Sequence, residues 1–470
     1  MEATITNQLE KIIKGNPTLN LIKPCRLNDG INKLNSTQSN HFTQLFDKKY
    51  SDKKVMFFIP ASGSGSRMFS FLFDFIEKKG IASQDTIEFI EQFLNNIENF
   101  SFYNKLPKQY KDDLRKGSIN IPSLVRFILL EEGLNFGQLP KGLIPFHLYD
   151  KFIINPFQEH ILQGTKIAGE KAEFHFTINP NFEPQINQSI KILHEITGID
   201  FSYSFSNQTE ESHSIAFTEN NEPAKNDEGE TIVRPSGHGA LVENLNQIEA
   251  DIIFIKNIDN VQHFDKAQNA LNTKKALGGL LIQFQNDISK LLEAIDSNEK
   301  DWTIKLDQII SSYQLFIPTE HVEDSNWIKN HFNRPLRICG MVKNEGQAGG
   351  GPFWVKDNDK ITPQIIEKSQ IHPNQLSIML HATHFNPVDI VCGTKNYKNE
   401  KFDLTNFIND DLYFIVHKKE KGQAIKYIEK PGLWNGAMYN WLTLFYEIDS
   451  DCFSPVKTVL DLLKPLHLED

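Results

Sequence analysis

The sequence predicts an α/β fold: a Rossmann-like, three-layer arrangement around a mixed sheet, with a helical insertion and a mixed α/β C-terminal part. Residues 54–60 form an uninterrupted apolar run, typical of a strand covered on both faces, and a Gly/Ser turn and a helical pattern over 67–79 follow it. Helical and strand patterns then alternate as far as residue 256. Helical periodicity dominates 264–312, and short strands and turns are expected after Pro335.

These patterns divide the chain into one main α/β domain and flanking segments. We expect a helical extension over residues 1–50 and the α/β domain over 51–430. Within that domain we expect a helical insertion at about 80–135 and a helical segment at about 262–315. Residues 431–470 are expected to form a C-terminal segment that packs on the functional site.

Capping residues and periodicity locate single elements. Asp85 can cap a helix, with Glu88 closing a capping box, and Pro122 can open another helix. A further helix is expected to start near Asn155. The expected strands are 173–177, 200–205 and 251–256, and a helix is expected over 185–197.

Composition argues against several function classes. The formal net charge of -11 disfavours general nucleic-acid binding, which needs a basic surface. The four cysteines form no CxxC pair, which predicts reduced, buried thiols and neither a zinc site nor disulfides. The first residues lack a signal-peptide pattern, and no apolar run approaches the roughly 20 residues that span a bilayer. We therefore expect a cytoplasmic protein with no membrane, nucleic-acid or protein partner.

A Gly/Ser-rich loop gives the strongest local signal. Residues 61–68 read Ala-Ser-Gly-Ser-Gly-Ser-Arg-Met. Glycines let the backbone approach a ligand closely, and the helix that follows presents its positive end to the same place. Arg67 adds a planar cation that suits phosphate oxygens. The loop has neither the Walker A nor the dinucleotide-binding pattern, so a phosphate site and a purely structural turn are equal alternatives.

Two further segments supply candidate residues. Lys141 lies between Pro140 and Gly142, on a restricted backbone that can aim its ammonium group, although an exposed turn lysine is the simpler interpretation. The apolar strand 251–256 is followed by Asn-Ile-Asp-Asn, and ligands of open α/β sheets bind beyond the carboxyl ends of strands. Asp259 could therefore hold Mg²⁺ against phosphates, or it could cap the next helix.

Taken in order, these segments resemble the UDP-sugar pyrophosphorylase family of nucleotidyltransferases, from about Val55 to Leu463, and are closest to a bacterial branch of it with no assigned substrate. The resemblance is carried by residues 60–68 (PASGSGSRM), 140–142 (PKG), 206–208 (SNQ), 235–239 (PSGHG), 257–260 (NIDN), 366–369 (IEKS), 384–389 (HFNPVD) and 453–457 (FSPVK). It implies a GT-A type sheet that binds Mg²⁺, an NTP, with UTP favoured, and a sugar 1-phosphate. The implied products are a nucleotide sugar and pyrophosphate.

The resemblance also assigns roles to single residues. The catalytic cations that it implies are Arg67, Lys141 and Lys457. The residues that it places at the nucleotide are Ala61, Ser62, Gly63, Gly65, Gln208, Pro235, Gly237 and His238. The residues that it places at the sugar are Gly340, Glu367 and Asn386, and those at the metal are Asp259 and, as a second ligand, Asp389.

Some positions depart from the family pattern. Ser62 stands where the family has Gly, Lys368 where it has Tyr, and residues 388–389 replace an Asn pair, which predicts a different sugar pocket. The attacking sugar phosphate is already anionic near neutral pH, because its second pKa is about 6, so no general base is expected. Two alternatives stay open. One is a non-catalytic nucleotide-sugar sensor, and the other is a glycosyltransferase with the same sheet type, for which residues 357–359 (Asp-Asn-Asp) are a weak signal.

Overall fold

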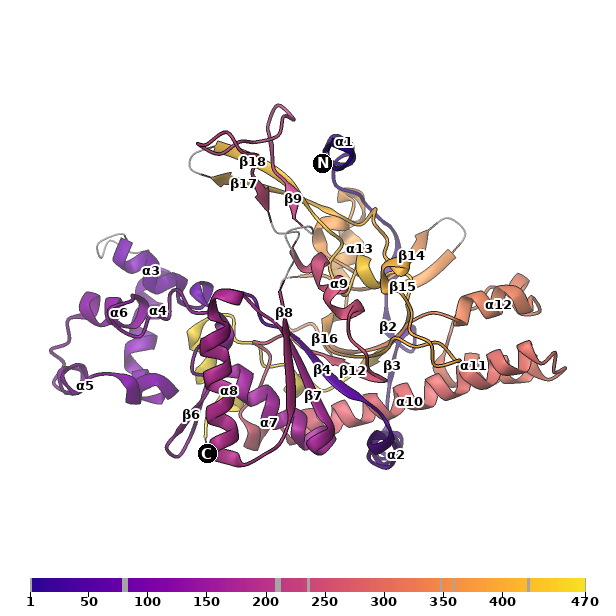
Figure 1. Cartoon of the computed structure of the whole chain (residues 1–470), viewed down its shortest axis with the longest axis horizontal. Coiled ribbons are helices and arrows are strands. Elements are labelled where there is room, and N and C mark those ends of the chain that lie inside the picture. Colours follow the sequence, from indigo (N-terminus) through magenta and orange to yellow (C-terminus); the bar gives the residue numbers. More distant parts are fainter. Residues whose placement is uncertain are drawn as a thin grey trace. The chain divides into compact units, whose positions relative to one another are not determined.

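The computed structural model describes residues 2–77, 83–207, 213–234, 237–346, 349–357, 360–420 and 423–469 (Figure 1). The chain is mixed α/β with parallel and antiparallel strand pairs, which confirms the predicted fold class. It divides into two compact units, each assembled from three stretches of sequence. Unit 1 contains Met1–Val55, Gln208–Ile255 and Lys275–Ser450, and unit 2 contains Met56–Asn207, Lys256–Lys274 and Asp451–Asp470.

Unit 1 is built on a mixed sheet. Its strands, in spatial order, are β2 (Arg26–Leu27), β3 (Gly30–Lys33), β19 (Leu442–Glu447), β13 (Leu336–Lys343), β16 (His384–Gly393) and β12 (Ile252–Ile255). β13 runs parallel to β19 and antiparallel to β16. β13 and β16 are eight and ten residues long, so the expectation of only short strands after Pro335 was wrong. Nearly every position of β13 is buried, because the apolar residues of this strand pack on both faces of the sheet.

Smaller sheets and helices complete unit 1. The remaining strands are β1 (Asn20–Pro24), β14 (Gly351–Asp357), β15 (Lys360–Ile366), β10 (Phe217–Thr218), β18 (Gln423–Glu429), β17 (Phe414–Glu420), β9 (Ser214–Ile215) and β11 (Val233–Arg234). The helices are α1 (Glu2–Lys14), α2 (Ser36–Lys49), α9 (Leu241–Asn246), α11 (Trp302–Tyr313), α12 (Ser325–Phe332) and α13 (Leu376–Leu380). The long helix α10 (Gln268–Asp296) begins in unit 2 and continues in unit 1. Residues 1–50, expected as a helical extension, thus also contribute three strands.

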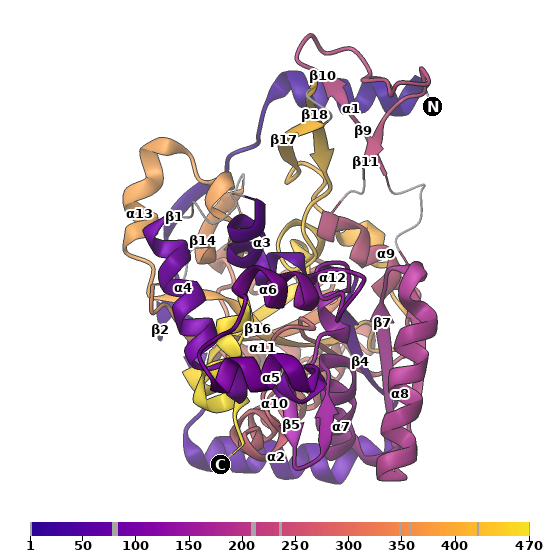
Figure 2. The ribbon, with the colours of Figure 1, turned by 90° about the vertical axis from the view of Figure 1, so that its left-hand side faces the viewer.

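Unit 2 opens with β4 (Val55–Pro60), and its strand order is β4, β7 (Ala172–Thr177), β8 (Ser202–Ser206). β7 and β8 are parallel, and α7 packs against β7 and against α8 (Figure 2). The helices are α3 (Ser70–Glu77), α4 (Gln84–Asn95), α5 (Lys108–Arg115), α6 (Ile121–Leu129), α7 (Pro156–Ala168) and α8 (Glu183–Thr197), and a hairpin joins β5 (His147–Tyr149) to β6 (Phe152–Ile154). Helices α4, α5 and α6 lie within residues 80–135.

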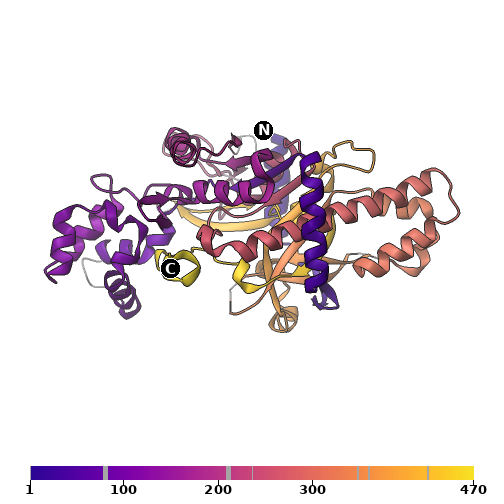
Figure 3. The ribbon, with the colours of Figure 1, turned by 90° about the horizontal axis from the view of Figure 1, so that it is seen from below.

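The C-terminal segment contributes to the core of unit 2. Val456, Val459 and Leu462 are buried in one apolar cluster with residues of the nearby helices, among them Leu72 of α3 and Leu124 of α6. Figure 3 shows the C-terminal residues, in yellow, beside those helices, in violet. Burial of these side chains fixes the segment that also carries Lys457.

The helix starts agree with the sequence-based predictions for two helices and differ for a third. Asn155 caps α7, and Asn120 caps α6, where Pro122 occupies the first turn. α4 is capped by Ser83 and not by Asp85, because the Ser83 hydroxyl accepts a hydrogen bond from Thr86 N at 3.3 Å. Ser83 satisfies a donor of the first turn that would otherwise be unpaired.

Candidate functional site

The glycine loop after β4 is joined by hydrogen bonds to the segment that carries Lys141. Lys141 N donates to Gly63 O at 3.0 Å, and Gly65 N donates to Leu139 O at 2.9 Å. A Cβ at Gly65 would collide with Ile144 Cδ1 and lie 3.0 Å from Leu139 O, so this position needs glycine. Two motifs about 75 residues apart in the sequence therefore form one structural feature of unit 2.

Asp259 is held in place by the C-terminal segment. Val456 N donates to Asp259 O at 3.0 Å, and Ser454 N donates to Asn260 Oδ1 at 3.0 Å. His263, and not Asp259, caps the helical turn that follows, so the capping alternative is not what the structure contains. These contacts bring Lys457 next to Asp259.

Lys141 and Lys457 converge on the Asp259 carboxylate. Lys141 Nζ lies 2.8 Å and Lys457 Nζ lies 3.0 Å from the same oxygen, Asp259 Oδ2. The side chains of Lys141 and Asp259 are only 13% and 10% exposed, whereas that of Lys457 is 65% exposed. Lys141 is thus not an exposed turn lysine. The cluster holds two cations and one anion beside the glycine loop.

The charges of this cluster shift the pKa of its members. Burial lowers the pKa of Lys141, and the neighbouring Asp259 carboxylate opposes that effect. Burial raises the pKa of Asp259, but the charges of Lys141 and Lys457 and the hydrogen bonds from them outweigh burial, so the pKa falls below its usual range. Asp259 is therefore ionised at neutral pH and serves as the counterion of two lysines.

Asp461 fixes the backbone at Lys457, and sequence reasoning missed it. Its Oδ2 accepts hydrogen bonds from Lys457 N and from Thr458 N, both at 2.8 Å. Thr458 and Asp461 form a capping box around a short helical turn, Val459–Leu463. A Thr followed three residues later by an acid is a recognisable signature of such a box.

The other residues of the predicted phosphate site belong to the glycine loop and the turn after it, and their side chains differ in solvent exposure. Arg67 occupies the turn Ser66–Phe69 and is exposed, and its side chain forms no hydrogen bond or ion pair with another described residue. Ala61 is buried and its N donates to Thr177 O at 2.9 Å. Ser62 is exposed, and the space around Gly63, where a Cβ would stand, is open among the described residues.

The structure describes the predicted base-binding residues only in part. Gln208 and Pro235 lie outside the described residues. Gly237 and His238 belong to the turn Gly237–Ala240 that leads into α9, and of His238 only the backbone is described.

The predicted sugar-binding residues and Asp389 belong to unit 1. Asn386 Nδ2 donates to Glu367 Oε1 at 3.1 Å, and burial raises the pKa of Glu367. Gly340 on β13 pairs in register with Asp389 on β16, and Asp389 is buried. Glu367 is thus hydrogen-bonded to Asn386, and Gly340 lies opposite Asp389 in the sheet.

A buried network of histidines and one glutamate lies within unit 2, and sequence reasoning did not find it. His147 Nδ1 is 2.8 Å from Glu159 Oε2, and His147 Nε2 is 3.0 Å from His467 Nδ1. Tyr149 also donates to Glu159, and His263 N donates to the Leu466 carbonyl. These contacts attach the C-terminal segment to β5 and α7. The participating residues are far apart in the sequence and show no shared spacing.

The strand pairings and helices define a mixed α/β fold, which is similar to that of a solved structure. Over 98% of this chain and 74% of the other, the structure is similar to the uridine diphosphate N-acetylglucosamine pyrophosphorylase from Trypanosoma brucei, solved with an inhibitor, at 12% sequence identity and a TM-score of 0.53. A UDP-glucose phosphorylase from the same organism matches over 98% and 78% of the two chains, at 11% identity and a TM-score of 0.44. The fold assignment rests on the first.

The chain belongs to the family described as "Domain of unknown function (DUF4301)", whose profile matches residues 1–468. A search of curated proteins found no match. All four cysteines are buried, and none of them forms a disulfide in the described structure. Among the helices that the structure describes, none is long and apolar enough to cross a membrane.

Proposed function

We propose that this protein transfers a nucleotidyl group from an NTP, with UTP favoured, to a sugar 1-phosphate, releasing pyrophosphate and forming a nucleotide sugar. The observation that carries the proposal is the convergence of Lys141 and Lys457 on Asp259, next to the glycine loop. The fold likeness to a pyrophosphorylase supports it. Phosphate-transfer chemistry of this kind depends on positioning and charge neutralisation, which such a cluster can supply.

The two lysines would exchange one anionic partner for another when a triphosphate binds. Without a ligand, both ammonium groups share the single negative charge of Asp259. Phosphate oxygens carry more charge than one carboxylate, so they compete for the same donors. Lys141, which is buried, would stabilise charge on the triphosphate, and the more exposed Lys457 would hold the attacking sugar phosphate.

The glycine loop would bring backbone close to the phosphates. Ser62, Gly63 and Ser64 are exposed, and a Cβ at Gly63 would meet no described atom within 4 Å. Arg67 lies in the turn Ser66–Phe69 that follows, and its exposed guanidinium could rotate toward a ligand. The attack needs no general base, because the nucleophile is an anionic phosphate oxygen.

Mg²⁺ fits this site as an ion held mainly by substrate phosphates. Among the described residues, no group of three His, Cys, Asp or Glu side chains could hold a metal ion by itself. Magnesium in nucleotide sites usually takes one or two carboxylates and completes its shell with phosphate oxygens and waters. We propose that Asp259 supplies the carboxylate and that the ion neutralises phosphate charge. Asp389 belongs to unit 1, and its expected role as a second ligand stays a prediction.

We further propose that Glu367 and Asn386 contact sugar hydroxyls. Their hydrogen bond orients both side chains, and a carboxylate and an amide together offer the donors and acceptors that hydroxyl groups need. Lys368, next to this pair, is the residue that would make the sugar preference differ from that of UDP-sugar pyrophosphorylases.

Pyrophosphate release tests the proposed reaction. The full-length protein is mixed with each of four NTPs and a panel of sugar 1-phosphates, with and without Mg²⁺, and pyrophosphate is measured. We expect release that needs both substrates and Mg²⁺, with UTP the best donor. Tight binding of a nucleotide sugar without turnover in either direction would support a sensor. Release of a free nucleoside diphosphate from a nucleotide sugar would support a glycosyltransferase.

A further inference from the structure

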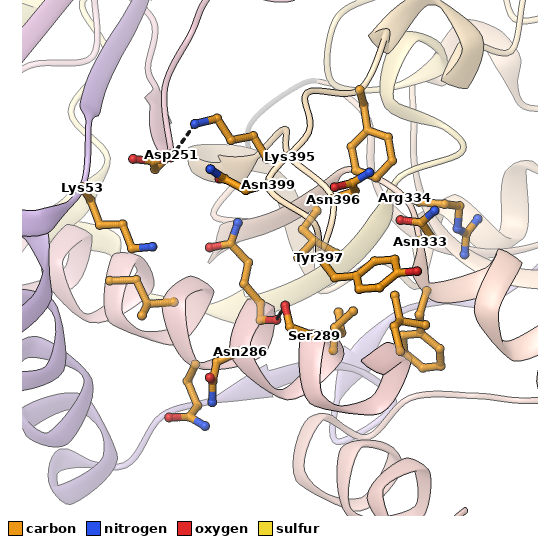
Figure 4. A pocket seen from close by; sticks show the side chains of 18 of the residues that line it. Lys53, Asp251, Asn286, Ser289, Asn333, Arg334, Lys395, Asn396, Tyr397 and Asn399 are labelled. Carbon is orange, nitrogen blue, oxygen red and sulfur yellow. Dashed lines mark hydrogen bonds and ion pairs between the residues drawn. The ribbon is translucent and has the colours of Figure 1, made fainter. Parts of the chain in front are cut away.

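Unit 1 contains a large polar cavity that the proposed reaction does not use. Its volume is about 550 Å³, within the range of roughly 300–1,000 Å³ typical of small-molecule sites. Its walls come from α2, from α10, from the segment after α12 and from the loop after β16, all of them in unit 1. Figure 4 shows Lys53, Asp251, Lys395 and Asn399 around one end and Asn333, Arg334 and Tyr397 around the other.

The lining of this cavity is positively charged, whereas the whole chain has a net charge of -11. Among the described residues that line it, the cations are Lys49, Lys53, Arg334 and Lys395, and the one carboxylate is Asp251. That carboxylate is already neutralised, because Lys395 Nζ lies 2.7 Å from Asp251 Oδ1 and Lys54 N donates to Asp251 Oδ2 at 2.8 Å.

The remaining cations form no close ion pair with a described residue. The charge of Lys53 helps to lower the pKa of Asp251, but that carboxylate is already bound by Lys395. Arg334 donates only to neutral acceptors: the carbonyl oxygens of His331 and Asn440 and the His331 ring. Burial lowers the pKa of Arg334 to about 10, so it stays charged at neutral pH. An uncompensated, partly buried cation is costly, and an anion in the cavity would remove that cost.

Neutral hydrogen-bonding groups and apolar side chains, such as Leu45, Ile282 and Phe402, form the rest of the wall. Gln285 and Asn286 on α10 and Asn399 in the loop make no side-chain hydrogen bond to a described residue. Asn333 carries a buried side-chain oxygen that has no hydrogen-bond partner in the described structure. Amides of this kind donate to and accept from hydroxyl and carbonyl groups of a ligand.

We propose that this cavity binds a small polar anion of metabolite size, which carries a phosphate or carboxylate group together with hydroxyl groups. The anionic group would lie near Lys49 and Lys53, and the hydroxyl groups would meet the amides of α10 and of the loop after β16. This site is separate in sequence from the glycine loop and from Lys141, and its occupancy does not depend on the proposed reaction.

Calorimetric titration of the full-length protein tests the site. The probes are glucose 6-phosphate, as a phosphate ester, citrate, as a polycarboxylate, and glucose, as a neutral control. We expect saturable binding of at least one anion at millimolar concentration and none of glucose. Reversal of the charges in the double variant Lys49→Glu, Lys53→Glu should weaken that binding by about tenfold or more.

Matched variants separate this cavity from other anion sites. Lys48→Glu changes an exposed lysine of the same helix that does not line the cavity, and it should leave binding unchanged. Lys141→Ala removes a cation of the unit 2 cluster and should also leave binding unchanged. If the double variant fails to fold, Lys53→Gln and Asn286→Asp should each weaken binding. Absence of saturable binding by both anions would overturn the proposal, as would binding that survives the double variant or is lost in Lys141→Ala.

Discussion

Lys141 illustrates how one side chain acquires a role from its surroundings. In the sequence it stands in a Pro-Lys-Gly turn, where an exposed lysine is the simplest interpretation. In the structure its ammonium group is largely buried and shares the Asp259 carboxylate with Lys457. Burial disfavours the charged ammonium group, so the pKa of Lys141 falls, and the Asp259 carboxylate, together with the charge of Asp461, opposes that fall.

Lys141→Ala should lower the turnover of the proposed reaction by about 10²–10³, the usual cost of removing one preorganised charge contact. Folding should survive, because Asp259 keeps Lys457 as its counterion. Steady-state pyrophosphate release and thermal unfolding measure the two effects. Lys166→Ala is the matched control, since Lys166 is an exposed lysine on α7 of the same unit. Equal activity of the two variants would remove Lys141 from the mechanism.

Glu159 shows a second consequence of burial at a single residue. Burial raises its pKa to about 8 from an ordinary 4.5, so the folded chain keeps a proton that the unfolded chain releases. Its contribution to the free energy of unfolding therefore falls as pH rises from 4.5 toward 8. Burial lowers the pKa of His467 from 6.5 to about 3. The contribution of His467 to the free energy of unfolding therefore falls as the pH drops below 6.5, because the unfolded chain then binds a proton that the folded chain does not.

In the Glu159→Gln variant, the free energy of unfolding should depend less on pH above about pH 6 than it does in the wild type. Glutamine is neutral at every pH and can keep hydrogen bonds to His147 and Tyr149 in place of a protonated carboxyl. Urea unfolding from about pH 6 to about pH 9 should show that the wild type loses more stability than the variant. If the free energy of unfolding changed with pH in the same way in both proteins, Glu159 would not hold a proton in the folded chain.

At the scale of elements, local patterns predicted much and long-range contacts little. The apolar run of β4 and the capping residues of α6 and α7 are readable, because they depend on neighbours within one turn or strand. The hydrogen bonds between Gly63 and Lys141 join segments that no local rule connects. The buried histidine network was missed for the same reason, since its members come from β5, α7 and the C-terminal segment.

The two loop glycines should respond differently to an added methyl group. Gly65→Ala should destabilise the fold by about 1–3 kcal/mol, because the new Cβ meets Ile144 and the Leu139 carbonyl. Gly63→Ala should leave the free energy of unfolding unchanged, since no described atom lies near that Cβ position. It should nevertheless lower turnover, because the added methyl group narrows the space for a phosphate. Chemical denaturation and pyrophosphate release measure the pair. Equal stability of both variants would contradict the tight junction at Gly65.

For the whole molecule, the sequence predicted an α/β chain but not how its parts are assembled. Each unit takes three separate stretches of sequence, and composition shows no linker at their boundaries. The C-terminal twenty residues belong to unit 2, where three of their apolar side chains join the core. This assembly depends on burial between distant segments, which periodicity within a segment cannot reveal.

Deletion of Asp451–Asp470 should therefore destabilise the protein and abolish the proposed activity. The loss should be several kcal/mol, because fully burying each side chain such as Val456 or Leu462 contributes roughly 1.5–3 kcal/mol. Lys457→Ala, in contrast, should lower activity with little effect on unfolding. Differential scanning calorimetry compares the two. A truncated chain as stable as the wild type would show that the segment is not part of the core.

Binding of inorganic pyrophosphate tests the central claim, that Lys141 and Lys457 hold a chain of phosphates, without depending on the identity of the sugar or base. Calorimetry with the full-length protein and Mg²⁺ should show saturable binding to the wild type and to Lys166→Ala. Binding should be weakened by at least about a hundredfold in the double variant Lys141→Ala, Lys457→Ala, since each of the two contacts to a charged group contributes about 1.5–3 kcal/mol. Undiminished binding of pyrophosphate to the double variant would contradict the account.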